Sequence, residues 1–290
     1  MNELLVVTPN GYKASKLYSI VPTDGSGDLT WVRNTIATRV NSSGLIESVS
    51  ANVPRLDYSG GVTCPCILVE PQRTNICLRS EELDDATWLK LNAGTGTTPS
   101  VTPDYSISPD GTSTADRVQF SNVGGSGSDS NYSLILQVSL TLSSTGTASF
   151  YLKSNTVLNQ NVLFYWAGGQ GQVFVVTPQW QRFYLNNLTP TTTGIAIGTR
   201  GGVGSYISGG DEVIDISVWG LQVEEGLIES SYIPTTSASQ TRNADVATVT
   251  TPVGVTSLIE TYEDGTTNVV SPIPVTYQMS EGRISKVVGL

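Results

Sequence analysis

Carboxylates are the side chains of this sequence that could do acid–base chemistry, because the chain contains no histidine. Without imidazole, neither a histidine-activated nucleophile nor a histidine-bound metal is possible. Two carboxylates about 5 to 10 Å apart would still suffice for glycoside hydrolysis. The candidates lie on or beside one expected strand: Asp211, Glu212, Asp215, Glu224 and Glu225. Nothing in the sequence sets their spacing or raises a pKa, so we interpret them as solvated charges and predict that the chain is not an enzyme.

Aromatic side chains offer a second chemistry, because the flat face of a ring can stack against the CH groups of a sugar. The residues that we expect to contact glycan are Tyr105, Tyr132, Tyr165 and Trp166. The alternative for each of them is a place in the core, where most aromatic residues of a β-sandwich lie. We expect Trp219, in the last strand of the sandwich, to belong to the core.

Three cysteines, Cys64, Cys66 and Cys77, lie close together in strand-like sequence. They favour an interpretation as buried reduced thiols that act as small hydrophobic groups. A Cys-Pro-Cys metal or redox pair is the alternative, but the chain has no histidine to complete a mixed zinc site. We expect no cofactor. A structural calcium ion in the Gly209–Glu212 loop, held by carboxylates and carbonyls, is conceivable.

The composition favours strands and turns. Charged residues make up 14% of the chain and apolar residues 38%, and there are 29 glycines. The formal net charge of −10 opposes a phosphate backbone and no stretch concentrates Lys or Arg, so nucleic acid is not an expected partner. No stretch approaches the roughly 20 apolar residues of a bilayer-spanning helix, so we expect no membrane insertion.

From about residue 88 to 233, short apolar runs alternate with turn residues, which is typical of an antiparallel jelly roll. We expect eight strands there, at 115–120, 132–142, 147–153, 161–166, 172–177, 181–185, 194–198 and 212–223. A change of phase in the last strand predicts a bulge near Gly220. The Ser80–Leu91 segment reads equally as a short helix or as a loop.

Outside the jelly roll the chain lacks a continuous core pattern. We divide it into an extended N-terminal β segment (1–80), the jelly-roll domain (81–248) and a small C-terminal domain of two β-hairpins (249–290). The hairpins would pair 257–262 with 267–271, around the Asp264-Gly265 turn, and 275–279 with 284–288. Because so small a sheet is marginal alone, we expect it to dock on the main domain or on another subunit.

Arginines recur among the apolar strands and tight turns of the first eighty residues. Arg39, Arg55 and Arg73 could each bind several carbonyls, or a carboxylate such as Asp57 or Glu70, and so hold irregular backbone in place. We therefore assign these arginines and Glu70 a structural role.

Several of these segments resemble the virion structural proteins of tailed bacteriophages. The first half of the resemblance lies in 38–47, 52–58 and 64–75, and the second half in 108–116, 180–183, 219–226 and 231–245. The second half is similar to a carbohydrate-binding-module-like jelly roll within the same proteins. Together the motifs span about residues 33 to 247.

The resemblance implies a structural component of the virion, assembled in the cytoplasm of the bacterial host. A capsid decoration or head-fibre protein, attached through the N-terminal segment, is the leading interpretation. A tail or tail-fibre subunit and a glycan-binding adhesion module are the alternatives, and a depolymerase lacks the expected β-helix repeats. The implied partners are major capsid, fibre or tail proteins, further copies of this chain, and host surface glycan.

Overall fold

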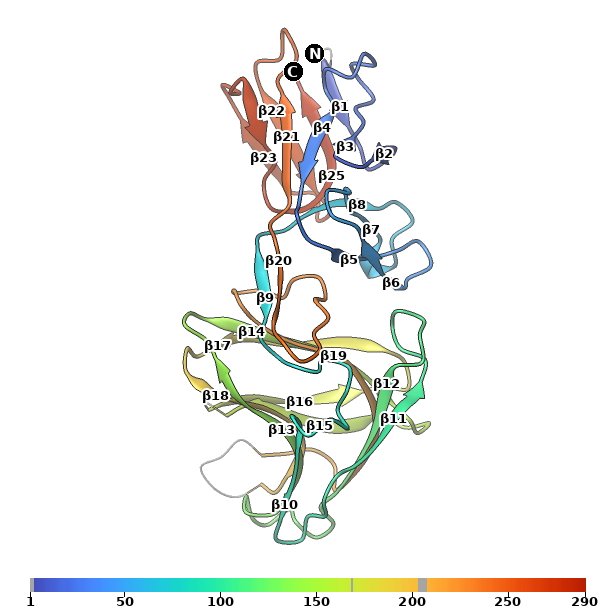
Figure 1. Ribbon diagram of the computed structural model, residues 1–290, viewed down its shortest axis with the longest axis vertical. Helices are drawn as coiled ribbons and strands as arrows, with labels where there is room; N and C mark the ends of the chain where they lie inside the picture. The colour runs from blue at the N-terminus through green and yellow to red at the C-terminus, as the bar shows by residue number, and fades with distance from the viewer. Residues whose placement is uncertain (1–2, 168, 203–207) are drawn as a thin grey trace. The chain divides into compact units, whose positions relative to one another are not determined.

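The computed structural model describes residues 3–167, 169–202 and 208–290 and divides the chain into two compact units (Figure 1). The terminal unit combines Met1–Arg73 with Thr241–Leu290, and the central unit is Thr74–Gln240. This division differs from the predicted boundaries after residues 80 and 248, because the two ends of the chain share one set of sheets.

The central unit consists of two five-stranded antiparallel sheets. We call them the β13 sheet and the β19 sheet after the longest strand of each. The β13 sheet has the order β10 (Leu89–Ala93), β13 (Tyr132–Thr141), β18 (Thr192–Arg200), β15 (Gln160–Trp166) and β16 (Gln170–Val176). The β19 sheet has the order β11 (Ser100–Ser106), β12 (Ala115–Ser121), β19 (Val213–Glu225), β14 (Gly146–Ser154) and β17 (Gln181–Leu188).

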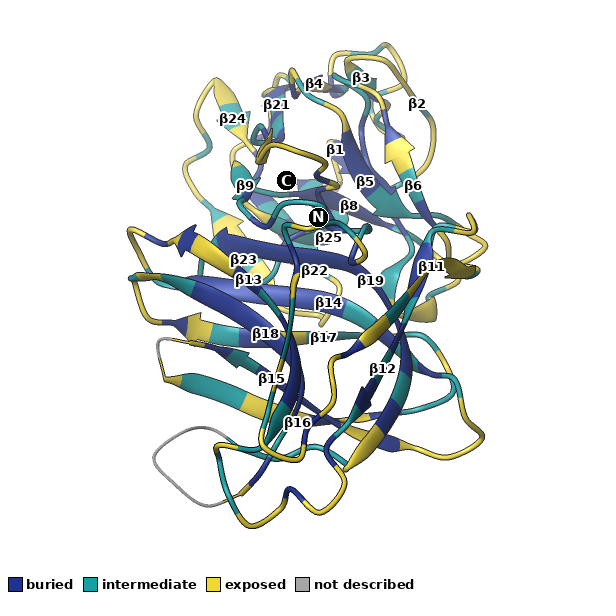
Figure 2. Ribbon diagram, turned by 60° about the horizontal axis from the view of Figure 1, so that its bottom comes forward, coloured by how far each residue is buried: buried dark blue, intermediate teal, exposed yellow. Residues whose placement is uncertain are grey.

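The core of the central unit follows from the alternation of side chains along its strands, as the buried stretches in Figure 2 indicate. In β14, Ala148, Phe150 and Leu152 are fully buried. The ring of Phe150 stacks on that of Phe164 from β15, with 3.7 Å between centroids, so the two sheets meet through aromatic packing. The prediction of an all-β antiparallel sandwich is confirmed.

The predicted bulge near Gly220 is confirmed. Pairing between β14 and β19 shifts register between Ser149 and Tyr151, and Gly220 has a φ of +65°, which side chains disfavour. The extra residue places Leu221 and Val223 in the same core as the strand before the bulge. Trp219 is buried as well, but its ring lies against Tyr232 outside that core.

The segment before the sandwich contains no helix among its described residues, so the loop alternative for Ser80–Leu91 holds. Two of its apolar side chains, Leu83 and Trp88, are fully buried in the sandwich core. The Leu83 amide donates to the Asp116 carboxylate, and the Trp88 indole donates to the Arg79 carbonyl. The strands β10 and β11, on either side of the next turn, were not predicted from the sequence.

The terminal unit is built from strands of both chain ends. One sheet has the order β23 (Thr267–Val270), β22 (Leu258–Tyr262), β25 (Gly282–Gly289), β8 (Cys66–Val69) and β7 (Leu56–Asp57), and β1 (Leu5–Val7) also pairs with β25. The other has the order β2 (Tyr12–Lys13), β3 (Lys16–Leu17), β4 (Leu29–Val32), β21 (Val246–Thr250) and β24 (Thr276–Gln278). The smaller elements of this unit are the hairpin β5 (Ala37–Val40) and β6 (Ile46–Val49) and the 3-10 turn Ser59–Gly61. The strands β9 (Arg73–Asn75) and β20 (Gln240–Arg242) pair with each other, and each contains one of the two boundaries between the units.

Only one of the two predicted C-terminal hairpins forms. β22 pairs with β23 around Asp264-Gly265, as expected, but β24 and β25 belong to different sheets. β25 pairs with β1, β8 and β22, whereas β24 pairs with β21. The apolar face of the C-terminal segment is thus covered by the N-terminal segment of the same chain, where Leu5, Leu29 and Trp31 are fully buried.

Within the described residues, no helix is long and apolar enough to span a membrane.

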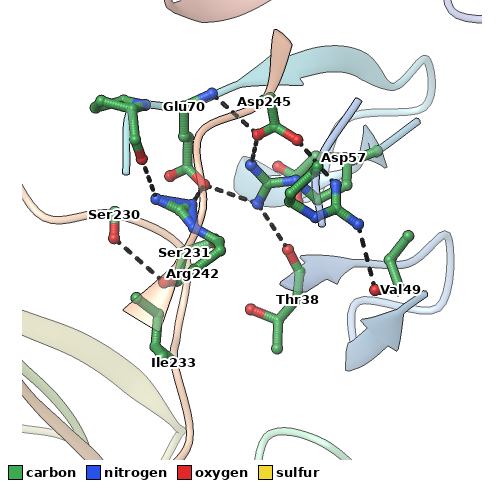
Figure 3. A network of polar contacts seen from close by, with 12 residues as sticks. Thr38, Val49, Asp57, Glu70, Ser230, Ser231, Ile233, Arg242 and Asp245 are labelled. Carbon is green, nitrogen blue, oxygen red and sulfur yellow. Dashed lines mark hydrogen bonds and ion pairs between the residues drawn. The ribbon is translucent and has the colours of Figure 1, made fainter. Parts of the chain in front are cut away.

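A buried ionic network ties these segments together (Figure 3). Asp245 accepts hydrogen bonds from the guanidinium groups of Arg33, at 2.8 Å, and of Arg55. Arg55 also pairs with Glu70 at 2.7 Å, and Glu70 with Arg242. The side chains of Arg33, Arg55 and Asp245 have no exposed surface. Arg33 donates further to the Ser50 carbonyl, at 2.7 Å, and Arg55 to the Thr38 carbonyl, at 3.0 Å, so the network also fixes the loops around β5 and β6.

We predict that Asp245→Ala destabilises the terminal unit by about 3 to 5 kcal/mol, because it leaves two buried guanidinium groups without their shared carboxylate. Amide hydrogen exchange in peptides that cover β4 and β21 measures the loss. Glu281→Ala, which removes an exposed acid of the same unit, is the control and should change stability by less than about 0.5 kcal/mol. Equal exchange in the two variants would contradict a stabilising role for the network.

Candidate functional site

The structure separates the four aromatic residues that we expected to contact glycan. Tyr105 lies in β11 of the β19 sheet and is 47% exposed. Tyr132 and Tyr165 lie on the other sheet, in β13 and β15, where Arg200 stands 5.1 Å from the Tyr132 ring and donates to the Tyr165 hydroxyl at 3.5 Å. Trp166 is fully buried in the sandwich core and donates to the Thr189 carbonyl. Side chains alternate along a strand, so Tyr165 points outward and the indole of Trp166 points into the core, where it cannot stack on a glycan.

Tyr105 belongs to a row of side chains that crosses the outer face of the β19 sheet. In the register of the sheet, Ser217 of β19 is opposite Arg117 of β12 on one side and Lys153 of β14 on the other. Directly opposed side chains in an antiparallel sheet lie about 5 Å apart on one face. The guanidinium of Arg117 covers the ring of Tyr105, at 4.9 Å from its centroid.

The same row ends in a second cation–aromatic pair. The Lys153 ammonium stands 5.2 Å from the centre of the Trp180 ring, and the Trp180 indole donates to the Ile107 carbonyl at 2.9 Å. Ile107 follows Tyr105 closely, and Ser106 between them donates to Ser217 at 3.0 Å. We call Tyr105, Arg117, Lys153, Trp180, Asp215 and Ser217 the aromatic surface.

Asp215 holds the polar part of the aromatic surface in place. Its carboxylate accepts two hydrogen bonds from Arg117 and one from Asn155, and Asn155 in turn accepts from Ser217 at 2.8 Å. The hydrogen bond from Arg117 lowers the pKa of the Asp215 carboxyl, and the bond from Asn155 adds to the effect, although partial burial opposes them. Ser217 itself has no exposed surface, so the polar groups that the surface presents beside the two aromatic rings are those of Arg117 and Asp215, whose side chains are 28% and 17% exposed.

Asp116 positions the backbone that carries Tyr105. Its carboxylate accepts a hydrogen bond from the amide of Asp104, at 3.0 Å, and one from Leu83, at 2.6 Å. Asp104 has a φ of +53°, a left-handed conformation that few residues other than glycine adopt. Burial raises the pKa of the Asp116 carboxyl from 3.8 to about 6, against the opposing effect of these two amides.

The carboxylates considered for glycoside hydrolysis do not converge. Asp215 and Glu224 lie nine residues apart on β19, about 30 Å at about 3.3 Å per residue. Glu224 is buried, where loss of solvation raises its pKa against hydrogen bonds from Ser230, whereas Glu225 caps the amide of Ser143 on the surface. In the Gly209–Glu212 loop, the Asp211 carboxylate accepts from the amide and the side chain of Asn161. Within the described ranges, no three His, Cys, Asp or Glu side chains cluster as metal ligands.

The residues assigned a structural role lie at different places. Arg55 and Glu70 belong to the buried ionic network of the terminal unit, and Arg39 pairs with Glu47 on its surface at 2.7 Å. Arg73 lies in β9 and donates to the Gln72 carbonyl at 3.2 Å. Trp219 is buried and donates to the Thr114 hydroxyl at 3.0 Å.

The cysteines do not share one environment. Cys66 and Cys77 are buried and Cys64 is exposed, so burial applies to two of the three thiols. All three are free thiols. Loss of solvation raises the pKa of the Cys66 and Cys77 thiols, which keeps both protonated and unreactive. Cys64 and Cys66 are two positions apart, where regularly extended backbone would place both on one face, so their different burial shows that the chain is not regular before β8.

Four residues of the aromatic surface were not among the expected functional candidates: Arg117, Lys153, Trp180 and Ser217. Alternation along β14 places Lys153 on the outward face, and Arg117 occupies an outward position of β12 by the same pattern. What the sequence lacked was the order of the strands, which brings β12 and β14 to either side of β19.

Comparison with known proteins yields similarity at the level of fold. No family model and no curated protein sequence matches the chain. Among solved structures, an endo-1,4-β-D-xylanase 10B fragment of Clostridium thermocellum with its CBM22-1 and GH10 modules, complexed with xylohexaose, is 13% identical at a TM-score of 0.30. An exo-β-1,3-galactanase of Phanerochaete chrysosporium with β-1,3-galactotriose is 14% identical at a TM-score of 0.28. The matches cover 58% and 67% of this chain but only 30% and 42% of those proteins.

The prediction that this chain is not an enzyme is wrong as a conclusion from the sequence. The two solved structures named above are those of a xylanase and a galactanase, and the absence of histidine does not exclude chemistry that needs only carboxylates. The similarity is weak, and it assigns no activity to this chain. None of the matching structures named above is a virion protein.

We predict that Asp116 titrates near pH 6 in the folded protein. Since an unfolded Asp titrates near 3.8, the folded state binds more protons between these values, and stability falls as the pH rises from about 4 to about 6. Asp116→Asn should lack this component, which urea unfolding followed by tryptophan fluorescence measures. The carbon-13 shift of the Asp116 carboxyl reports the same proton directly. A midpoint below pH 5 would contradict the prediction.

Proposed function

We propose that this chain is a glycan-binding component of a bacteriophage particle, with the central unit contacting sugars through the aromatic surface. The observation that carries the proposal is the pairing of a half-exposed Tyr105 ring with hydrogen-bonding groups held in fixed positions beside it. Sugars present apolar CH faces and hydroxyl edges, so a glycan site combines aromatic rings with preorganised polar groups.

The charges of the aromatic surface support a neutral or weakly charged glycan. Arg117 is already paired with Asp215, while Lys153 lies against the Trp180 ring. Both cations are thereby held in place, and ordering them on binding costs little conformational entropy. The row extends across three neighbouring strands, β12, β19 and β14, which suits a chain of sugar units better than a single one.

The place on a phage particle rests on the sequence resemblance. Its motifs include Arg55, Glu70, Arg242 and Asp245, four of the five residues whose side chains join the two halves of the terminal unit; the fifth is Arg33. A unit fixed in this way suits attachment to a particle, and the central unit would then present the glycan site. We propose a capsid decoration or head-fibre position, with the tail as the alternative.

For the glycan site, we predict that Tyr105→Ala combined with Trp180→Ala weakens glycan binding at least tenfold, about 1.4 kcal/mol, because both stacking faces are lost. The measurement is binding of the full chain to an array of bacterial surface polysaccharides and plant or fungal glycans, followed by titration of the strongest hit. Tyr18→Ala, which removes a tyrosine of the terminal unit that is 36% exposed, is the matched control. An array without hits, or equal binding by both variants, would reject the glycan site.

For the particle, we predict that purified virions contain this chain in a fixed copy number and that antibody labelling decorates the head. Mass spectrometry and electron microscopy of the particles give the two readouts. Labelling of the tail would favour the alternative location. Particles that lack the chain would refute the virion assignment. The glycan site would then be tested by the glycan array alone.

A further inference from the structure

The terminal unit contains a polar pocket of about 410 Å³ that is separate from the aromatic surface. The side chains that matter to the argument are Asn10, Tyr12, Arg39, Asn41, Glu47 and Tyr58. Leu56 supplies an apolar part of the lining. The volume lies within the range of about 300 to 1,000 Å³ that is typical of small-molecule sites.

The β5–β6 hairpin positions the charged part of this pocket. Arg39 and Glu47 are cross-strand partners, and the Arg39 Nε donates to the Glu47 carboxylate at 2.7 Å. The other carboxylate oxygen accepts from the Asn41 amide at 3.1 Å. The Asn41 side-chain oxygen accepts from the amides of Ser43 and Leu45, which fixes the turn and hence the direction of that amide.

Two tyrosines stand beside the ion pair. Tyr12 accepts a hydrogen bond from Arg39 at 3.2 Å, and the guanidinium lies 5.7 Å from the centre of its ring. Tyr58 is held by its backbone, whose amide donates to the Val40 carbonyl at 2.9 Å. Both tyrosines are partly exposed, so the pocket offers aromatic surface next to charged hydrogen-bonding groups.

Several polar groups of the pocket are not used by the fold. In the part of the chain that the structure describes, the Arg39 Nη1, the side-chain amide of Asn10 and the Tyr58 hydroxyl have no hydrogen-bond partner in the protein, whereas the Asn10 backbone amide donates to the Thr8 carbonyl. The Glu47 oxygens each accept one hydrogen bond and keep a further lone pair. Donors and acceptors are thus both available, which suits hydroxyl groups because each hydroxyl donates and accepts at once.

We propose that this pocket binds a neutral monosaccharide or disaccharide unit. Arg39 and Glu47 cancel in charge, so an anionic ligand would gain the guanidinium but meet the carboxylate beside it. A neutral ligand with adjacent hydroxyls can accept from Arg39 and donate to Glu47, with a ring face on Tyr12 or Tyr58. The site lies wholly in the terminal unit, so it does not depend on the glycan site proposed for the central unit.

The test is titration of the full chain with methyl glycosides of glucose, galactose, mannose and N-acetylglucosamine, followed by saturation-transfer NMR and calorimetry. We expect at least one of them to bind with a dissociation constant in the millimolar range, about −4 kcal/mol. Methyl glucuronide should bind at least threefold more weakly than methyl glucoside, because its carboxylate faces Glu47.

Asn10→Ala combined with Tyr58→Phe should weaken binding at least fivefold, since it removes only groups that the fold does not use. Ser48→Ala, an exposed change on the same hairpin outside the pocket, is the matched control. Tyr105→Ala with Trp180→Ala should leave this binding unchanged, which distinguishes failure of the pocket from failure of the aromatic surface. Equal thermal unfolding of all variants verifies that they fold.

Three results would overturn the proposal. The first is that none of the four neutral glycosides binds at about 10 mM. The second is that binding survives the Asn10 and Tyr58 changes undiminished or is lost equally with Ser48→Ala. The third is tighter binding of methyl glucuronide than of methyl glucoside, which would assign the pocket to acidic ligands.

Discussion

The terminal unit depends on one carboxylate. Asp245 lies just before β21 and is bound by two guanidinium groups that come from the N-terminal half of the chain, Arg33 and Arg55. All three side chains are excluded from solvent, so none of these charges can be satisfied by water. A buried charge without its partner is strongly destabilising, so each half of the terminal unit needs the charged side chains of the other. We infer that the network specifies which segments meet.

That coupling explains how a chain can insert a whole sandwich into another unit. The central unit occupies the 167 residues between Arg73 and Thr241, so the two halves of the terminal unit are distant in sequence. The entropic cost of bringing two chain segments together grows only slowly with the number of residues between them. An insert that folds into its own unit also reduces the effective length of the flexible chain between those segments. The pairing of β1 with β25, the first and last strands, and of β4 with β21 then completes both sheets.

In the central unit, the same sheets create both a core and a surface. On β14, Phe150 points into the sandwich while Lys153 points out, beside Ser217 of β19. The bulge at Gly220 extends the buried face of β19, and the Trp219 ring just before it packs against the ring of Tyr232. The polar pocket of the terminal unit arises differently, from a turn that Asn41 fixes and from a cross-strand ion pair. The chain thus offers two surfaces with the chemistry of sugar contact, one in each unit.

Interactions between residues close together in the sequence determined many of the strands and turns of this protein. Alternation of apolar residues defined all eight predicted strands of the sandwich, the change of phase at Gly220 revealed the bulge, and Asp264-Gly265 marked a true hairpin, because these features depend on neighbours in the chain. Side-chain partners depend on strand order instead. Only the tertiary structure decided that β24 pairs with β21 and not with β25, that Trp166 lies inside while Tyr105 lies outside, and that Arg117 and Lys153 flank Ser217. Contacts between residues far apart in the sequence depend on how whole sheets pack and pair, and a local sequence pattern does not predict that.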